Sequence, residues 1–405
     1  MTMLEVITGI ALSLLALECL FYFLINYLKK DFQWLLTKVD DLPELSTEVV
    51  DKFFANSYDP ELGWVRKKNS TGVDKGKNGP VKYSIDSLGS RHTSNNDIET
   101  TAPVIASFGD SYTFCRQVEN EQTWQAVMGA QLNSHVLNFG VGNYGLDQGL
   151  IRYNSTPLPD SVDTVIMGVV PETICRVHSY WKHYLEFGNT LAFKPRFKLE
   201  NGEMVFCPNI IKDKEDFQHL SKHLDNIQKN DEFYLKKYCS HRFSRSYFVS
   251  FFKHPKHNSA LVYYILKKKL YRLFGLATAK IESAPFGVIM KNNITESHKM
   301  YMEAQYCDLL RALILKFKED ALKNGHKPIL LVMPQLMDLK FFENKAIPYD
   351  EFYASLEQEL DVLDLTKSLL AEDYSDFYIN DQYGGHFSEK GNRFVAEKLL
   401  KQIKL

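Results

Sequence analysis

The sequence predicts a flavodoxin-like three-layer α/β/α fold, with a parallel sheet at its centre and an apolar helix at its N-terminus. From Pro103 onward, short apolar runs alternate with stretches of helical periodicity, the pattern of a parallel sheet covered by helices. The apolar helix is predicted because the residues from Leu4 to Leu28 are almost all hydrophobic. The composition, 45% hydrophobic and 24% charged among 405 residues, is that of a folded globular protein.

The apolar N-terminal stretch is long enough to be a transmembrane anchor, which we place at residues 1–30. A helix rises about 1.5 Å per residue, so this stretch covers the roughly 30 Å hydrocarbon core of a bilayer. We do not expect cleavage as a signal peptide, because Glu5 stands where such peptides have a basic region. Lys29, Lys30 and Lys38 follow the stretch and favour a cytoplasmic location for the rest of the chain.

Glu18 lies near the middle of the anchor, where an ionised carboxylate is costly and usually faces a partner. One hypothesis is therefore a membrane acyltransferase partner that contacts Glu18. The alternative is a protonated Glu18 on a helix that stands alone in the bilayer.

The rest of the chain divides into an arm and a core that is interrupted by an insertion. We expect an N-terminal arm at 31–100 and a core built from 101–172 and 296–405. The stretch between the two core parts, 173–295, is too long for a loop of a compact domain, so an inserted, lid-like subdomain is expected there.

Length and residue type predict the individual elements. Runs rich in β-branched and apolar residues predict five buried strands: Val104 to Phe108, Val136 to Phe139, Thr164 to Gly168, Pro328 to Met333 and Val362 to Leu365. Longer amphipathic stretches predict helices: Thr123 to Leu132, Ser297 to Asn324, Tyr349 to Leu360 and Ser388 to Ile403. In the insertion, Asn201-Gly202 separates two extended runs, Phe197 to Glu200 and Glu203 to Phe206, and predicts a hairpin.

A serine follows the first predicted strand, in the sequence Gly109-Asp110-Ser111-Tyr112. Open α/β sheets bind their ligands at the carboxyl ends of the strands, so this position suits a nucleophile. Gly109 permits a tight turn, and we expect Ser111 to start the next helix with its N–H facing a developing oxyanion. Cys115 is expected to pack inside that helix rather than to act as a nucleophile.

A serine hydroxyl becomes a nucleophile only when a neighbouring base accepts its proton. The best candidate is His386, in Gly384-Gly385-His386-Phe387-Ser388, between the last predicted strand and the last helix. In a doubly wound sheet this loop emerges at the same edge as Ser111. We therefore predict that Ser111 and His386 form a catalytic pair.

Together these motifs resemble those of the SGNH/GDSL hydrolases. The first block is GDSYTF at 109–114, and the last is GGHFSEKGN at 384–392. Glu121-Gln122-Thr123-Trp124 and Asn138-Phe139-Gly140-Val141 match between them. The combination is far more specific than the GDS triplet alone.

The resemblance implies an oxyanion hole formed by the backbone N–H groups of Ser111 and Gly140. The family's third donor is usually an asparagine side chain after the third strand, where this chain has Glu172 and Thr173. An ionised Glu172 would repel an oxyanion. Glu172 is therefore protonated or points away, or else Thr173 or Asn143 donates in place of the asparagine.

The resemblance also implies an orienting acid three residues before the histidine, where this chain has Tyr383. Asp381 lies five residues before His386 and is our candidate, because Gly384 and Gly385 permit the loop to bend. Asp376 and Asp373 remain alternatives.

Charge and spacing argue against other classes of function. The net charge of −2 gives no reason to expect nucleic acid as a partner. His178 with His183, and His254 with His257, lack the i, i+4 spacing of zinc-binding helices, so no metal is expected. No cofactor is expected either.

The segment 233–281 contains eleven Lys or Arg, twelve aromatic residues and no Asp or Glu. One hypothesis is that Phe243 to Phe252 and Tyr263 to Phe274 lie on an anionic leaflet below the anchor. The alternatives are a basic groove for an anionic glycan or lipid-linked substrate, and ordinary solvated helix faces.

The resemblance implies a membrane-anchored serine esterase or O-acyltransferase that works through an acyl-enzyme. Passages at 58–64 and 83–89 resemble those that precede the GDS block in members associated with polysaccharides, so the expected substrate is an acyl ester, typically acetyl, of a glycan. Such members place their catalytic domain outside the cell, in contrast to the side that Lys29 and Lys30 favour. A lipid esterase and a catalytically silent glycan-binding or scaffold protein are the alternatives.

Overall fold

A five-stranded parallel sheet forms the centre of the computed structural model, which describes residues 2–38, 42–93, 102–278, 281–343, 345–379 and 385–403. The strands lie in the order β11-β10-β7-β5-β6, and each neighbouring pair is parallel. Counted along the chain, this is the order 2-1-3-4-5 of flavodoxin-like folds. The bounds are Ile105–Gly109 (β5), Val136–Asn138 (β6), Thr164–Val169 (β7), Lys327–Val332 (β10) and Asp361–Asp364 (β11). The five predicted strands and the fold class are thus confirmed.

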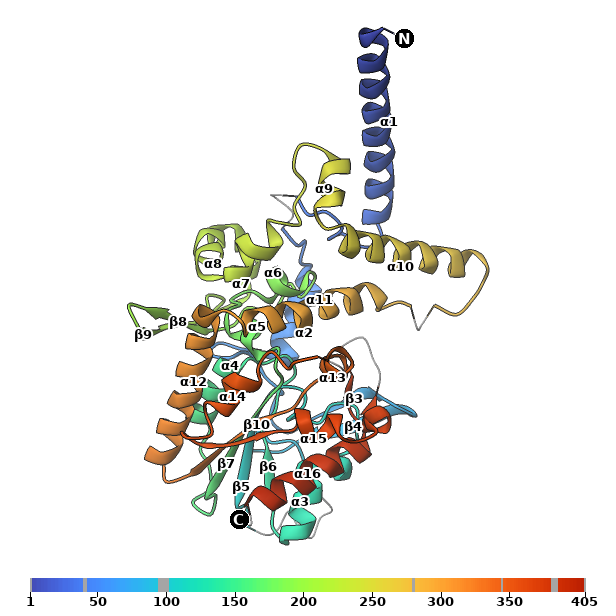
Figure 1. Cartoon of the computed structure of the whole chain (residues 1–405). Coiled ribbons are helices and arrows are strands. Elements are labelled where there is room, and N and C mark those ends of the chain that lie inside the picture. The colour runs from blue at the N-terminus through green and yellow to red at the C-terminus, as the bar shows by residue number, and fades with distance from the viewer. Residues whose placement is uncertain are drawn as a thin grey trace.

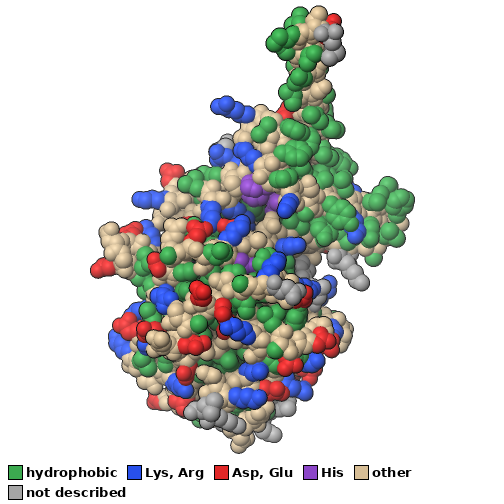
Figure 2. All heavy atoms as spheres, in the orientation of Figure 1, with side chains coloured by type: hydrophobic (Ala, Val, Ile, Leu, Met, Phe, Trp, Pro, Cys, Tyr) green, Lys and Arg blue, Asp and Glu red, His purple; other side chains and the backbone are tan. Residues whose placement is uncertain are grey.

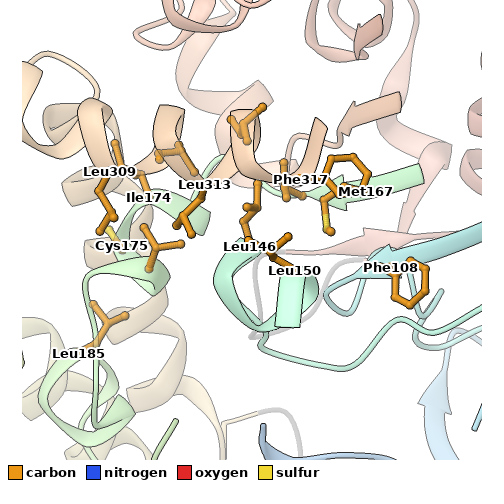
Figure 3. Packing of buried hydrophobic residues seen from close by; sticks show 14 of the residues in the cluster. Phe108, Leu146, Leu150, Met167, Ile174, Cys175, Leu185, Leu309, Leu313 and Phe317 are labelled. Atoms are coloured by element: carbon orange, nitrogen blue, oxygen red, sulfur yellow. The ribbon is translucent and has the colours of Figure 1, made fainter. Parts of the chain in front are cut away.

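Helices cover both faces of the sheet, because successive strand side chains point into two different apolar clusters. On one face, Ile105 and Ile166 pack with α3 (Trp124–Leu132) and α16 (Glu389–Ile403). On the other, Phe108 and Met167 pack with α4 (Leu146–Ser155) and α12 (Ala304–Lys323) (Figure 3). The second cluster continues into the insertion through Ile174, Cys175 and Leu185.

The helix predicted from Ser297 to Asn324 is wrong as a single element. The chain forms α11 (Ala284–Met300) and then α12, with a break at 301–303. The break is a tertiary effect, since the Tyr301 hydroxyl donates to the carbonyl of Pro171 at 2.9 Å. The helix predicted at Tyr349 to Leu360 is also shorter, covering Asp350–Ala354 (α14), and α4 was not predicted.

Residues 173–295, where an insertion is expected, form mainly short helices and carry the predicted hairpin. Strands β8 (Arg196–Glu200) and β9 (Glu203–Cys207) are antiparallel, and Asn201 and Gly202 have φ of 53° and 85° between them. The hairpin prediction is confirmed. The helices are α5 (Thr173–Val177), α6 (Lys182–Glu186), α7 (Lys214–Gln218), α8 (Leu224–Asn230), a π-helical turn at Tyr234–Tyr238, α9 (Tyr247–Lys253) and α10 (Pro255–Leu273).

Further small elements pack around the core. In the N-terminal arm, β3 and β4 pair as an antiparallel hairpin, and β12 pairs with β13 just before the last helix. Their bounds, with those of the other small elements, are Thr47–Asn56 (α2), Tyr58–Asp59 (β1), Gly63–Trp64 (β2), Ser70–Gly76 (β3), Gly79–Ile85 (β4), Leu336–Phe342 (α13), Thr366–Leu370 (α15), Tyr378–Ile379 (β12) and His386–Phe387 (β13).

The N-terminal helix α1 (Met3–Lys29) projects from the body of the molecule (Figure 1). By length and composition it can cross a membrane, with a mean hydropathy of 2.1 over an 18-residue window that is not buried. Glu18 accepts hydrogen bonds from Ser246 Oγ at 2.6 Å and from the N–H groups of Tyr247 and Phe248 at 2.6 and 3.1 Å. Because the chain itself supplies these donors, the depth of Glu18 does not require a second protein.

Candidate active site

Ser111 follows the carboxyl end of β5, at the point where the strand order of the sheet reverses. Gly109 ends the strand with φ of 147°, and a Cβ there would lie 2.0 Å from the carbonyl oxygen of Gly168 on the neighbouring strand. Only glycine fits this position. The serine is 8% exposed. This is the edge at which flavodoxin-like sheets bind their ligands.

Ser111 does not start a helix, contrary to our expectation. The chain from 111 to 117 forms consecutive turns, with left-handed φ of 58° at Cys115 and 75° at Gln117, and α3 begins only at Trp124. Cys115 is nevertheless buried, and its thiol contacts Gln125 Oε1 at 3.1 Å. Burial raises the pKa of Cys115 to about 12, so it stays a thiol at neutral pH and is a poor nucleophile.

The structure brings His386 and Ser111 together. His386 Nε2 lies 2.9 Å from Ser111 Oγ, and both side chains are buried. The histidine is held by β13, which pairs with β12, and by the ring of Tyr112, whose centroid lies 5.0 Å from the imidazole. The Tyr112 hydroxyl also donates to the carbonyl of Gly385. The residue after the serine therefore fixes the loop that carries the histidine.

The proposed orienting acid, Asp381, lies outside the described residues, as does Tyr383. The two alternatives are described and lie at the surface. Asp373 accepts from the N–H of Ser375 at the start of a short 3-10 turn. The Asp376 side chain is 72% exposed and lies 3.9 Å from Lys390. Neither carboxylate contacts His386, so Asp381 stays our prediction for the acid.

The cavity beside Ser111 is lined by Gly142 and Asn143 after β6, but not by Gly140. The Gly140 N–H donates to Asn138 Oδ1 at 3.0 Å, and a Cβ at Gly140 would lie 2.2 Å from the backbone nitrogen of Phe114. Gly140 therefore packs against the turn after Ser111 instead of facing a substrate. Asn143 has a left-handed φ of 68°, and its side-chain Nδ2 donates to Glu186 Oε2 at 2.9 Å.

The N–H groups of Ser111 and Asn143 donate to no acceptor within the described part of the chain. Thr173, the other candidate donor, does not line the cavity. Its hydroxyl oxygen accepts from the N–H of Leu146 at 3.0 Å, and its side chain is buried away from the cavity lining. Of the candidate donors, Ser111 and Asn143 are thus the two on the cavity.

Arg176, on α5, is a site residue that our sequence reasoning missed. It lines the cavity, and its Nη1 lies 3.0 Å from Asp110 Oδ2 and 3.1 Å from the carbonyl oxygen of Tyr144. Its Nη2 lies 2.9 Å from Glu172 Oε2. Burial alone would lower the pKa of Arg176, but Glu172 and Asp110 outweigh it and raise that pKa, so the residue stays charged. The only sequence signal was the i, i+4 spacing of Glu172 and Arg176.

Glu172 accordingly faces Arg176, which answers the concern that its charge would repel an oxyanion. Asp110 is held from three sides, since it also accepts from the N–H of Tyr112 at 2.8 Å and of Val170 at 3.3 Å. This network joins the turn that carries Ser111 to the segment after β7.

The cavity has a volume of about 590 Å³, within the range of small-molecule sites. Its roof is formed on one side by Glu186 at the end of α6 with the following Phe187 to Asn189, and on the other by Ser283 and the α11 residues Phe286 and Met290. An adjoining cavity of about 310 Å³ shares Arg66, Gly142, Asn143 and Asn189 with it and adds Trp64. The Trp64 indole N–H donates to the carbonyl of Gly142 at 3.0 Å, so the N-terminal arm borders the site.

No group of three or more His, Cys, Asp or Glu side chains among the described residues is arranged to hold a metal ion. The described part of the cavity brings together the Ser111 hydroxyl, the His386 imidazole and the N–H groups of Ser111 and Asn143.

The strand order is flavodoxin-like, and the serine after the first strand and the histidine before the last helix lie where the resemblance to the SGNH/GDSL hydrolases predicts them. Two solved structures are similar at 13% identity: a lipolytic protein of the G-D-S-L family from Desulfitobacterium hafniense DCB-2 and a lipase/acylhydrolase from Enterococcus faecalis. The first match covers 74% of this chain and 98% of the other with a TM-score of 0.31, and the second covers 75% and 95% with 0.30. No family model and no curated protein matches the sequence.

Proposed function

We propose that this chain is a serine esterase or O-acyltransferase that transfers an acyl group, in the first place acetyl, from or to a glycan. The observation that supports this most is the 2.9 Å contact between Ser111 Oγ and His386 Nε2 at the floor of a cavity. This is the spacing that a nucleophile and its general base require.

In this mechanism Ser111 Oγ attacks the ester carbonyl while its proton moves to His386 Nε2. A new Oγ–C bond forms, and the oxyanion accepts hydrogen bonds from the N–H groups of Ser111 and Asn143. The C–O bond to the alcohol then breaks, and the alcohol takes the proton from His386. Water or a sugar hydroxyl completes the cycle by attacking the acyl-enzyme, with His386 again as the base.

Arg176 acts in this scheme as a positioning residue. Through Asp110 it holds the turn that carries Ser111. Asp381 is proposed to orient His386, as the resemblance implies.

The glycan as substrate is supported by the extended shape of the site. The two adjoining cavities share Asn143 and Asn189, and Trp64 lies beside Arg66 in the smaller one. Amide side chains and an indole are suited to binding sugar hydroxyls and the apolar faces of sugar rings. A lipid esterase is the second candidate, favoured by the exposed apolar helices α9 and α10 of the insertion.

The test is to incubate the purified full-length chain with p-nitrophenyl acetate and follow both p-nitrophenol release and the mass of the Ser111 peptide. We expect an acetyl adduct on Ser111 that decays faster when an acceptor oligosaccharide is added and becomes acetylated. Decay with water alone would assign an esterase. A preference for long-chain lipid esters over acetylated oligosaccharides would assign the lipid substrate instead, and no adduct and no turnover would refute the proposed function.

A further inference from the structure

Helices α9 and α10 of the insertion present apolar side chains to the outside of the molecule. On α10, Tyr263, Leu266, Leu270 and Leu273 are 42–77% exposed and follow one another at spacings of three and four residues. These positions form one face of a helix. The opposite face is also apolar, with Leu261 and Ile265 fully buried, so the exposed face is not the one that holds α10 to the protein.

The exposed face continues on α9 and beyond the end of α10. Val249 and Phe252 on α9 are 53% and 51% exposed, and Phe274 and Leu276 after α10 are 67% and 53% exposed. Figure 2 shows hydrophobic side chains along α1 and over the adjoining region of these helices. So many large apolar side chains exposed near one another are rarely left in water.

Helices α9 and α10 both contact the C-terminal part of α1, between Glu18 and Tyr27. The ring of Phe21 lies 5.1–5.7 Å from the rings of Phe248, Phe251 and Phe252, and Tyr22 lies 5.3 Å from Tyr247. Glu18 accepts the first N–H groups of α9 and so fixes the start of that helix against α1. At the end of α1, Lys269 of α10 lies 4.3 Å from the Tyr27 ring and pairs with Asp31 at 2.5 Å.

This part of α1 is where a membrane interface is expected. A hydrocarbon core of roughly 30 Å takes about 20 helical residues, so a span that begins at Met3 ends near Tyr22. Tyr side chains are enriched where the bilayer core meets the headgroups, and the contacts of Tyr22, Tyr27 and Tyr247 lie at this level. Helix α10 runs across the direction of α1 (Figure 1), as a helix in the plane of that interface must.

We propose that α9 and α10, together with residues 274–276, form a lipid-binding arm, distinct from the N-terminal arm. This lipid-binding arm, called the arm below, binds the surface of the lipid bilayer that α1 crosses. The charge of the arm favours a leaflet with anionic lipids. Residues 247–276 contain six Lys or Arg and no Asp or Glu, although Lys268, Lys269 and Arg272 pair with Glu282 and Asp31. An apolar groove of about 740 Å³ between Tyr27 and Tyr263, Leu266 and Leu270 offers room for part of an acyl chain.

The arm is connected through α11 to the cavity beside Ser111. Helix α11 packs against both α10 and α5, and its residues Phe286 and Met290 line the cavity above Ser111. Binding of the arm to the bilayer therefore fixes the position of the cavity roof relative to the membrane. The lipid contact itself does not depend on catalysis by Ser111.

The experiment places the photo-crosslinking residue p-benzoylphenylalanine at Val249 or Leu270 in the full-length chain. The protein is reconstituted in nanodiscs of phosphatidylethanolamine and phosphatidylglycerol, irradiated, and searched for lipid adducts by mass spectrometry. Leu12 in α1 is the positive control. Phe206 on β9 and Leu322 on α12, which are 49% and 56% exposed, are matched controls at apolar surface positions away from the arm.

We expect lipid adducts at Leu12, Val249 and Leu270, and none above background at Phe206 and Leu322. Adducts at Leu12 alone would overturn the proposal, because they would mean that only α1 meets lipid. Crosslinks from Leu270 to a second copy of the chain, without lipid adducts, would also overturn it and assign the arm to a protein interface. Since lipid adducts need no esterase activity, this result is independent of the test of the proposed function.

Discussion

The guanidinium of Arg176 lies 3.0 Å from the carboxylate of Asp110, the residue that precedes Ser111. The two residues are 66 positions apart and meet because β5 and β7 are neighbours in the sheet. The arginine balances two buried carboxylates, Asp110 and Glu172, and thereby holds the turn that carries Ser111.

Replacing Arg176 by Met is expected to destabilise the fold by about 3–5 kcal/mol, because it leaves buried carboxylates without their cation. The measurement is the free energy of unfolding in denaturant. Arg176→Lys should recover part of the loss and of the turnover of p-nitrophenyl acetate, since it keeps the charge. Arg393→Met, at a side chain that is 60% exposed, is the control and should change little. Equal stability of Arg176→Met and wild type would refute the role of this network.

The core was predictable because its signals are local. Each strand of the sheet is a short apolar run, and Ser111 and His386 stand in motifs at strand and helix ends. Arg176 was not predictable, because its role depends on Asp110 across the sheet. The break between α11 and α12 likewise depends on a distant contact, from Tyr301 to Pro171, and no Gly or Pro marks it in the sequence.

Of the oxyanion donors expected from the sequence, Ser111 and Asn143 line the cavity, whereas Gly140 and Thr173 do not. The resemblance implied the N–H of Gly140 as a donor, but that N–H donates to the side chain of Asn138. Asn143 instead lines the cavity and has a left-handed φ. Such a backbone choice is set by the packing of Gly140 against Phe114, which the sequence does not show.

The substitution Asn143→Gly removes the side chain and keeps the backbone N–H, so it tests which of the two is the oxyanion donor. Glycine adopts φ of 68° without strain and keeps the N–H, so we expect kcat for p-nitrophenyl acetate to stay within a few-fold of wild type. Loss of an oxyanion donor would instead cost roughly 3 kcal/mol of transition-state stabilisation, about a hundredfold in kcat. A hundredfold drop in Asn143→Gly, in a variant with unchanged stability, would mean that the side chain is the donor.

Gly140→Ala is expected to lower the melting temperature and the activity together. Its new Cβ would lie 2.2 Å from the backbone nitrogen of Phe114 and push the turn after Ser111 away. Gly142→Ala is the matched control, because a Cβ there meets nothing within 4 Å. Thermal unfolding of both variants checks this. A melting temperature of Gly140→Ala equal to that of Gly142→Ala would contradict the packing that we describe.

The packing of the lipid-binding arm (α9 and α10) against the rest of the protein is expected to weaken below pH 6.5. Burial lowers the pKa of His257 from 6.5 to about 3, and the nearby Lys237 and His254 add to the effect. The unfolded chain then binds the proton at a higher pH than the folded chain. Stability is therefore fully present above pH 6.5 and falls below it, by about 1.4 kcal/mol per pH unit for this group.

Hydrogen exchange in α9 and α10, corrected for the intrinsic rate, measures this effect between neutral pH and about pH 5. His257→Gln should reduce the pH dependence, because glutamine does not titrate. His219→Gln, at an exposed position, should leave it unchanged. The same pH dependence in His257→Gln and wild type would assign the effect to other groups.

The central claim is that Ser111 is a nucleophile activated by His386, and labelling with a fluorophosphonate probe tests it most directly. We predict one covalent adduct on the peptide that contains Ser111 in the folded full-length chain. The adduct should be absent in Ser111→Ala and much reduced in His386→Gln, with circular dichroism confirming that both variants are folded. A folded wild-type chain that takes up no probe, or a label that persists in Ser111→Ala, would contradict the account.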